Sequence, residues 1–115
     1  MADPQIKQGL HTFIRLLNQE RYWEAHETLE RLWFPIRKSK RPQVTPLKLL
    51  INGAVILELQ RRGRPDAAGR VLCAFSRKRR LLYRYNGVEA GMVRLAHRHL
   101  RQKLIHLTLP ASVSF

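Results

Sequence analysis

The pattern of apolar positions along the chain predicts helices throughout. Apolar residues recur every three or four positions, which is the spacing of one face of an α-helix, and no stretch alternates with period two for long enough to predict a strand. Helix starts are marked by Asp3-Pro4 and Thr45-Pro46, and Gly63 lies where a left-handed C-cap belongs. The sequence therefore predicts an all-α fold.

Five helices forming a compact bundle account for most of the chain. We expect them over residues 4–17, 20–34, 45–62, 65–85 and 88–106. A chain of 115 residues is long enough to bury one core. We therefore expect a single domain over residues 1–115, with its core at about 4–106 and an irregular tail over 107–115.

The composition excludes several classes of protein. A hydrophobic fraction of 44% and a charged fraction of 26% are ordinary for a globular protein. The longest apolar run, residues 47–59, is interrupted by polar residues and is shorter than the roughly 20 residues of a membrane span. One cysteine, Cys73, excludes a disulfide framework and a cysteine-rich zinc module. The N-terminus lacks the apolar segment of a secretory signal, so we expect a soluble, cytoplasmic protein.

Charge is unevenly distributed along the chain. The sequence has 22 Lys and Arg against 8 Asp and Glu, a formal net charge of +14. Residues 1–30 contain three basic and five acidic residues, a net of −2, whereas residues 31–115 contain nineteen basic and three acidic residues, a net of +16. Because a basic surface attracts polyanions, the expected partner is nucleic acid or an acidic protein. The alternative is that the charge is solvated surface without a dedicated partner.

Much of this charge is arginine on the fourth and fifth predicted helices, where a helical wheel places it in one stripe per helix. Such stripes fit a phosphate backbone, because arginine binds phosphate with parallel N–H groups and each contact releases counterions. Solvated helix faces remain the alternative, because the sequence contains no recognised nucleic-acid-binding motif. The candidate polyanion-binding residues are Arg70, Arg77, Arg80, Arg84, Arg94, Arg98 and Arg101.

The second predicted helix contains both tryptophans of the protein and a pair of polar residues beside them. At about 100° per residue, His26 and Glu30 fall on one face at the edge of the apolar arc, whereas Glu27 falls on the opposite, solvated arc. The candidate residues of a pocket or signature face on this helix are Tyr22, Trp23, His26, Glu27, Glu30 and Trp33.

Three interpretations of that face stay open. His26 and Glu30 form a structural pair that locks the bundle, or they are the polar points of a ligand pocket walled by aromatic rings. Alternatively, they are metal ligands at helical spacing, although the positive charge of the chain repels a cation. A third ligand would have to come from another histidine, such as His97, His99 or His106.

The run NQERYWEAHETLERLW, residues 18–33, resembles the signature helix of a family of small helical proteins, domain of unknown function family 309. The resemblance continues, in the same order, at residues 50–56, 61–68 and 85–89. It implies a small all-α bundle and no established activity. The chain departs from the family's pattern at Asn52, Arg64, Ala67 and Glu89. The positions that define the signature are Tyr22, Trp23, Glu24, His26, Glu27, Glu30 and Trp33.

These features favour a non-enzymatic binding module without a cofactor. The chain has no phosphate-binding loop, nucleophile elbow or dinucleotide fingerprint. Its expected partners are nucleic acid or an acidic protein, and an exposed tryptophan on the second helix would indicate a homo-oligomer. The alternative is a metal-assisted hydrolase with His26 and Glu30 as ligands and Glu27 as base. The position of Glu27 on the opposite arc weakens that alternative.

Overall fold

The computed structural model describes residues 3–107. All regular secondary structure in that range is helical, with turns and loops joining the helices. The predicted all-α fold is therefore confirmed. The tail predicted to be irregular lies outside the described residues from position 108 onward. The helices are α1 (Pro4–Asn18), α2 (Tyr22–Trp33), the short 3-10 helix η1 (Phe34–Ile36), α3 (Val44–Arg61), α4 (Pro65–Lys78), α5 (Leu81–Arg84) and α6 (Ala90–Leu104).

Two predicted helices differ from the structure. The second begins at Tyr22 instead of Glu20, because Glu20 adopts a left-handed backbone conformation with φ 60° that no α-helix contains. The fourth is divided into α4 and α5 by a turn at residues 79–80. Hydrogen bonds from residues 82 and 83 to carbonyls three positions back tighten the chain there. Leu82 and Tyr85 are buried beyond this turn.

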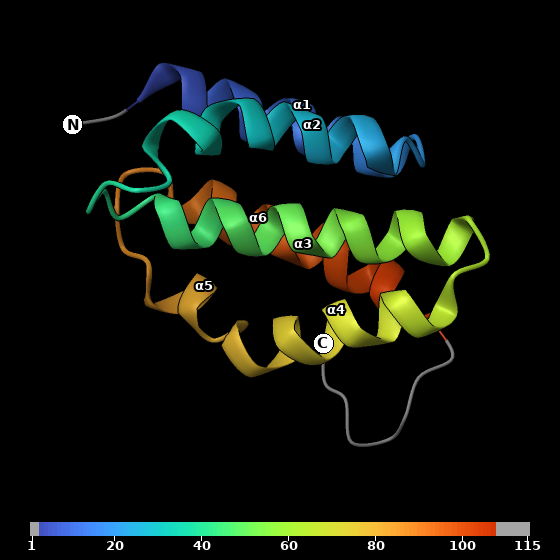
Figure 1. The fold of residues 1–115 in the computed structure, drawn as a ribbon. Coiled ribbons are helices and arrows are strands. Elements are labelled where there is room, and N and C mark those ends of the chain that lie inside the picture. Colours follow the sequence, from blue (N-terminus) through green and yellow to red (C-terminus); the bar gives the residue numbers. More distant parts are fainter. Residues whose placement is uncertain (1–2, 108–115) are drawn as a thin grey trace.

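α3 is the central element of the fold. It packs against α2, α4, α5 and α6, while α1 packs against α2 and α6 (Figure 1). A helix covered on most sides must be apolar around most of its circumference, and α3 buries ten of its 18 residues. None of the helices in residues 3–107 combines the length and apolar character needed to cross a bilayer. The largest fully buried side chains are Phe13, Phe75, Leu10, Leu17, Leu29, Leu47, Leu50, Ile51, Ile56, Leu72, Leu82 and Leu100.

A buried carboxylate joins three segments at one end of the bundle. Glu89 is 3% exposed, and it accepts hydrogen bonds from the hydroxyl of Tyr85 at 2.5 Å and from the backbone N–H of Asp3 at 3.0 Å. Asp3 caps α1 with its own side chain and receives a hydrogen bond from Arg41 at 3.3 Å. This network fixes the start of α1 against the loop before α3 and the start of α6.

The turn between α3 and α4 depends on Gly63. Its φ of +72° lies in the left-handed region that glycine enters without steric cost, as predicted for a C-cap, and a Cβ there would meet no atom within 4 Å. Gly63→Ala is therefore expected to lower the free energy of unfolding by about 1 kcal/mol through backbone strain alone. Urea unfolding measures this change. An unchanged stability would contradict the left-handed conformation.

Candidate functional site

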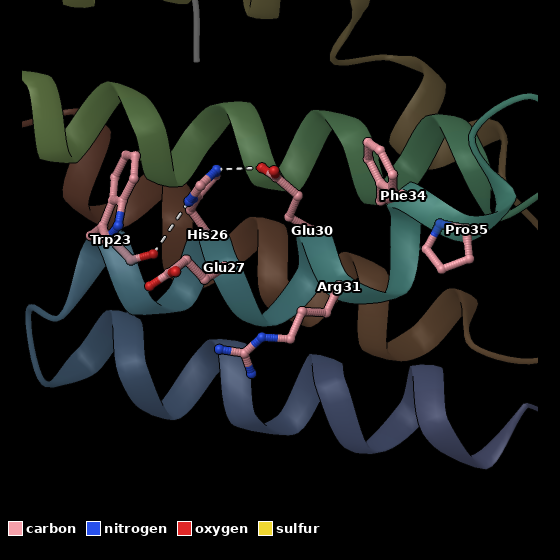
Figure 2. A pocket seen from close by; sticks show the side chains of 7 residues that line it. All are labelled: Trp23, His26, Glu27, Glu30, Arg31, Phe34 and Pro35. Carbon is pink, nitrogen blue, oxygen red and sulfur yellow. Dashed lines mark hydrogen bonds and ion pairs between the residues drawn. The ribbon is translucent and has the colours of Figure 1, made fainter.

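α2 forms one wall of an open pocket of about 430 Å3 (Figure 2). Four of the six residues predicted for this helix face line it together, and α2's last turn and η1 supply the others. The two remaining candidates, Tyr22 and Trp33, pack against the core instead. The structure thus divides the predicted face into a pocket side and a core side. The pocket is lined by Trp23, His26, Glu27, Glu30, Arg31, Phe34 and Pro35.

His26 is held on both sides of its ring. Nδ1 lies 3.3 Å from the carbonyl oxygen of Trp23, and Nε2 lies 2.5 Å from Oε2 of Glu30. A carbonyl accepts hydrogen bonds and cannot donate them, so Nδ1 carries a proton in this arrangement. The imidazole also lies 4.5 Å from the Trp23 ring, centroid to centroid, at an interplanar angle of 36°. His26 is 12% exposed and Glu30 is 44% exposed, so the carboxylate remains open to a ligand.

Glu27 lines the same pocket, although the wheel placed it on the opposite, solvated arc. Figure 2 shows His26 and Glu30 on the side of α2 toward α3, Arg31 extending toward α1, and Glu27 in front of α2 between them. The pocket therefore extends across more of the helix surface than the face that the wheel identified. Within residues 3–107, neither Glu27 nor Arg31 takes part in an ion pair, so both charges are available.

The other signature residues have structural contacts. Tyr22 is half-buried, and burial together with the negative charge of Glu20 raises the pKa of its hydroxyl. The hydrogen bond from Arg21 lowers the pKa of the exposed Glu24. The ring of Trp33 lies under the Lys48 ammonium at 4.3 Å from its centroid.

Two arginines outside α2 stack on the aromatic walls of the pocket. The guanidinium carbon of Arg62 lies 5.0 Å from the Trp23 ring centroid, and that of Arg37 lies 3.5 Å from the Phe34 centroid. Nε of Arg62 donates to Oε2 of the buried Glu58 at 2.6 Å, which fixes its direction. Helical periodicity could not identify these contacts, because both arginines belong to other segments. The only sequence signal was their membership of basic clusters at 37–41 and 61–64.

The described part of the chain contains no group of three His, Cys, Asp or Glu side chains arranged to hold a metal ion. The histidines considered as a third ligand lie on or just after α6, which packs on α1 and α3. Nδ1 of His97 lies 2.6 Å from the Tyr83 hydroxyl, and Nδ1 of His99 lies 3.3 Å from the Asn18 amide. His26 and Glu30 therefore lack a third protein ligand among residues 3–107.

The seven arginines of the predicted stripes are all exposed, and none has a carboxylate partner within the range that the structure describes. Residues 65–107 contain ten Lys and Arg but only two acidic residues, Asp66 and Glu89, a net of +8. Glu89 is buried and bonded to Tyr85, so it contributes little to the surface. The surface of α4, α5 and α6 is consequently almost purely cationic, whereas the arginines around α2 and α3 include several in ion pairs.

Comparison with known proteins gives one family. A family model described as Domain of unknown function (DUF309) matches residues 10–71. No curated protein and no solved structure matches the chain. The matched range covers α2, η1, the loop of residues 37–43 and the turn containing Arg62, and it ends inside α4. The pocket is thus within the family region, and most of the arginine stripes lie beyond it.

Proposed function

We propose that this chain, which belongs to the family Domain of unknown function (DUF309), is a non-enzymatic protein that binds nucleic acid through the arginines of α4, α5 and α6. The observation that carries the proposal is that seven exposed arginines, six on these helices and Arg80 in the turn between α4 and α5, lack carboxylate partners in the described range. Uncompensated like charges repel each other and destabilise the compact state, and binding a polyanion relieves this cost.

The spacing of the arginines favours a regular polyanion over an acidic protein. Arg70 and Arg77 are seven residues apart on α4, as are Arg94 and Arg101 on α6, so each pair spans roughly 10 Å. Phosphates recur at fixed intervals along a nucleic acid, whereas carboxylates on a protein surface have no such repeat. Arginine also binds phosphate with two parallel hydrogen bonds, which lysine cannot do.

Binding of a labelled single-stranded RNA across about 50 to 200 mM salt tests the proposal. Arg77→Ala/Arg84→Ala is expected to weaken binding about tenfold or more and to reduce the slope of log affinity against log salt by about 1.4, roughly 0.7 per lost phosphate contact on a single strand. Both side chains are exposed, so the fold is expected to persist.

The matched control is Lys7→Ala/Arg15→Ala, which removes two exposed cations from α1. It is expected to change the affinity and the salt slope far less. Equal losses in the two double variants would contradict a dedicated surface on α4–α6. Absence of binding to the RNA at 50 mM salt would overturn the proposed function.

A further inference from the structure

We propose that the α2 pocket receives one unpaired base of the bound strand and that it prefers guanine. This inference rests on the proposed function and adds base recognition to it. The arginine stripes contact phosphates, which carry no sequence information. The pocket has a different chemistry, with two aromatic walls and two carboxylates.

The aromatic walls are unusually open for large apolar side chains. Trp23 is 43% exposed and Phe34 is 54% exposed, and both line the pocket. Exposed aromatic rings grouped around one concave site are typical of platforms on which unpaired bases stack. Tyr22 and Trp33 on the same helix are packed against the core, so among the aromatic rings of α2 and η1 exposure is confined to the two that line the pocket.

The charges of the lining select the ligand. A simple cation is disfavoured by the net charge of +14 and by the arginines around the pocket. A suitable ligand has negative charge where it meets the arginines at the two ends of the pocket. Between these ends it presents N–H donors to the carboxylates of Glu27 and Glu30. A nucleotide within a strand has this arrangement, with phosphates on both sides of a base that carries N–H groups.

Guanine fits the carboxylates best. Its Watson–Crick edge presents the N1–H and the N2 amino group side by side, so both donate to the two oxygens of one carboxylate. Adenine and cytosine place an acceptor nitrogen beside their amino group, and uracil places its N–H between two carbonyls, so a carboxylate meets repulsion on each of these edges. Glu27 is free of ion pairs among residues 3–107 and is the expected partner for guanine.

The flanking phosphates have guanidinium groups at both ends of the pocket. Arg62 stacks on Trp23 and Arg37 stacks on Phe34. These two aromatic residues are 11 positions apart, or roughly 16 Å along a helix. Arg62 and Arg64 lie at the turn between α3 and α4, at the end of the bundle where α2 begins (Figure 1). A strand leaving the pocket at Arg62 therefore follows cationic residues onto α4.

Fluorescence anisotropy with two labelled RNA 12-mers tests this inference on the full chain. One probe is oligouridine, and the other is identical except for a single central guanosine. The guanosine is expected to raise the affinity about tenfold, in line with one stacked and hydrogen-bonded base. Glu27→Gln is expected to abolish that difference, because it removes the carboxylate that accepts from guanine. Trp23→Ala is expected to weaken the binding of both probes, because stacking accepts any base, and Trp23→Phe, which keeps a stacking surface, is expected to retain part of that binding.

Glu20→Gln is the matched control for Glu27→Gln, because Glu20 is an exposed carboxylate just before α2 that does not line the pocket. It is expected to leave the guanosine preference unchanged. Equal affinity of the native chain for both probes would overturn base recognition and leave the proposed function intact. Failure of both probes to bind would overturn the two together. Size-exclusion chromatography compares the oligomeric states of the native chain and Trp23→Ala. A native dimer that becomes a monomer in Trp23→Ala would identify this face as a dimer interface and overturn the inference.

Discussion

Replacement of Gly53 by alanine is expected to lower the free energy of unfolding by about 2 kcal/mol, the cost of overpacking a closed core. Gly53 lies where α3 packs against α6, and a Cβ there would lie 2.1 Å from Cδ2, 2.9 Å from Cγ and 3.0 Å from Cδ1 of Leu100. Leu100 is fully buried, so its side chain has no free space into which to rotate. Urea unfolding followed by circular dichroism measures the loss.

Two other glycines provide graded controls. A Cβ on Gly9 would lie 2.3 Å from Cδ1 of Leu32 but 3.7 Å from its Cγ, and Leu32 is half-buried and able to rotate, so Gly9→Ala is expected to cost less. A Cβ on Gly69, inside α4, would meet nothing within 4 Å. Gly69→Ala is therefore expected to raise the stability by about 0.5–1 kcal/mol through helix propensity.

A double-mutant cycle assigns the cost of Gly53→Ala to its neighbour. Leu100→Ala alone is expected to cost about 2–5 kcal/mol, because it leaves a cavity. In the double variant the new methyl group at position 53 fills part of that cavity. The free energies of unfolding lost in the two single variants are thus expected to sum to at least about 1 kcal/mol more than the loss measured in the double variant. Additive losses would mean that Gly53 does not determine how closely α3 and α6 approach.

Local signals predicted most of the helix boundaries, although the start predicted at Thr45-Pro46 is wrong in detail, because α3 begins at Val44 with Gln43 at its N-cap. The caps at Asp3-Pro4 and Gly63 are properties of a few neighbouring residues, and the structure contains them as expected.

The left-handed conformation of Glu20 closes α1 locally. The N–H of Glu20 donates to the carbonyl of Leu17 at 3.0 Å, and the N–H of Arg21 donates to that of Leu16 at 2.9 Å. No signal in the sequence predicted it, because glycine usually occupies that position. The turn between α4 and α5 is a tertiary effect, since it accompanies the burial of Leu82 and Tyr85.

The candidate site shows the same division. Periodicity placed His26 and Glu30 on one face beside Trp23, and in the structure His26 contacts both Trp23 and Glu30 along a single helix. The contacts of Arg37 and Arg62 with the pocket's aromatic rings depend on how η1 and α3 approach α2. A helical wheel describes one helix at a time, so it cannot predict such contacts. The wheel separated Glu27 from His26 and Glu30, but it could not show that Glu27 also lines the pocket, because the pocket extends past one face of the helix.

Glu89→Gln is expected to lower the free energy of unfolding by about 2–3 kcal/mol at pH 7, because hydrogen bonds to a buried charged acceptor contribute more than neutral ones. Burial raises the pKa of Glu89, but the hydrogen bonds from Tyr85 and from the N–H of Asp3 outweigh this and hold the pKa below 4.5. Glu24→Gln, at an exposed ion pair with Arg21, is the control and is expected to have little effect.

The sign of the pH dependence follows from the lowered pKa of Glu89. The unfolded chain binds a proton at this carboxyl near pH 4.5, whereas the folded chain binds it only at lower pH. The stabilisation is therefore complete above pH 4.5 and is lost as the pH falls through the folded-state pKa. Urea unfolding between pH 7 and pH 3 is expected to show the gap between the native chain and Glu89→Gln narrowing below pH 4.5. A gap that stays constant over this range would contradict the assignment.

The hydrogen bond between Tyr85 and Glu89 also makes the stability of the fold decrease at alkaline pH. Burial, the hydrogen bond to Glu89 and the charge of that carboxylate raise the pKa of Tyr85 from 10.0 to about 12. Between these values the unfolded chain has lost the phenolic proton and the folded chain has kept it, so the contribution of Tyr85 to stability falls as the pH rises. Tyr85→Phe is expected to be less stable at pH 7 and to lack this alkaline loss. If Tyr85→Phe lost stability between pH 10 and 12 as steeply as the native chain, the alkaline loss would belong to other groups.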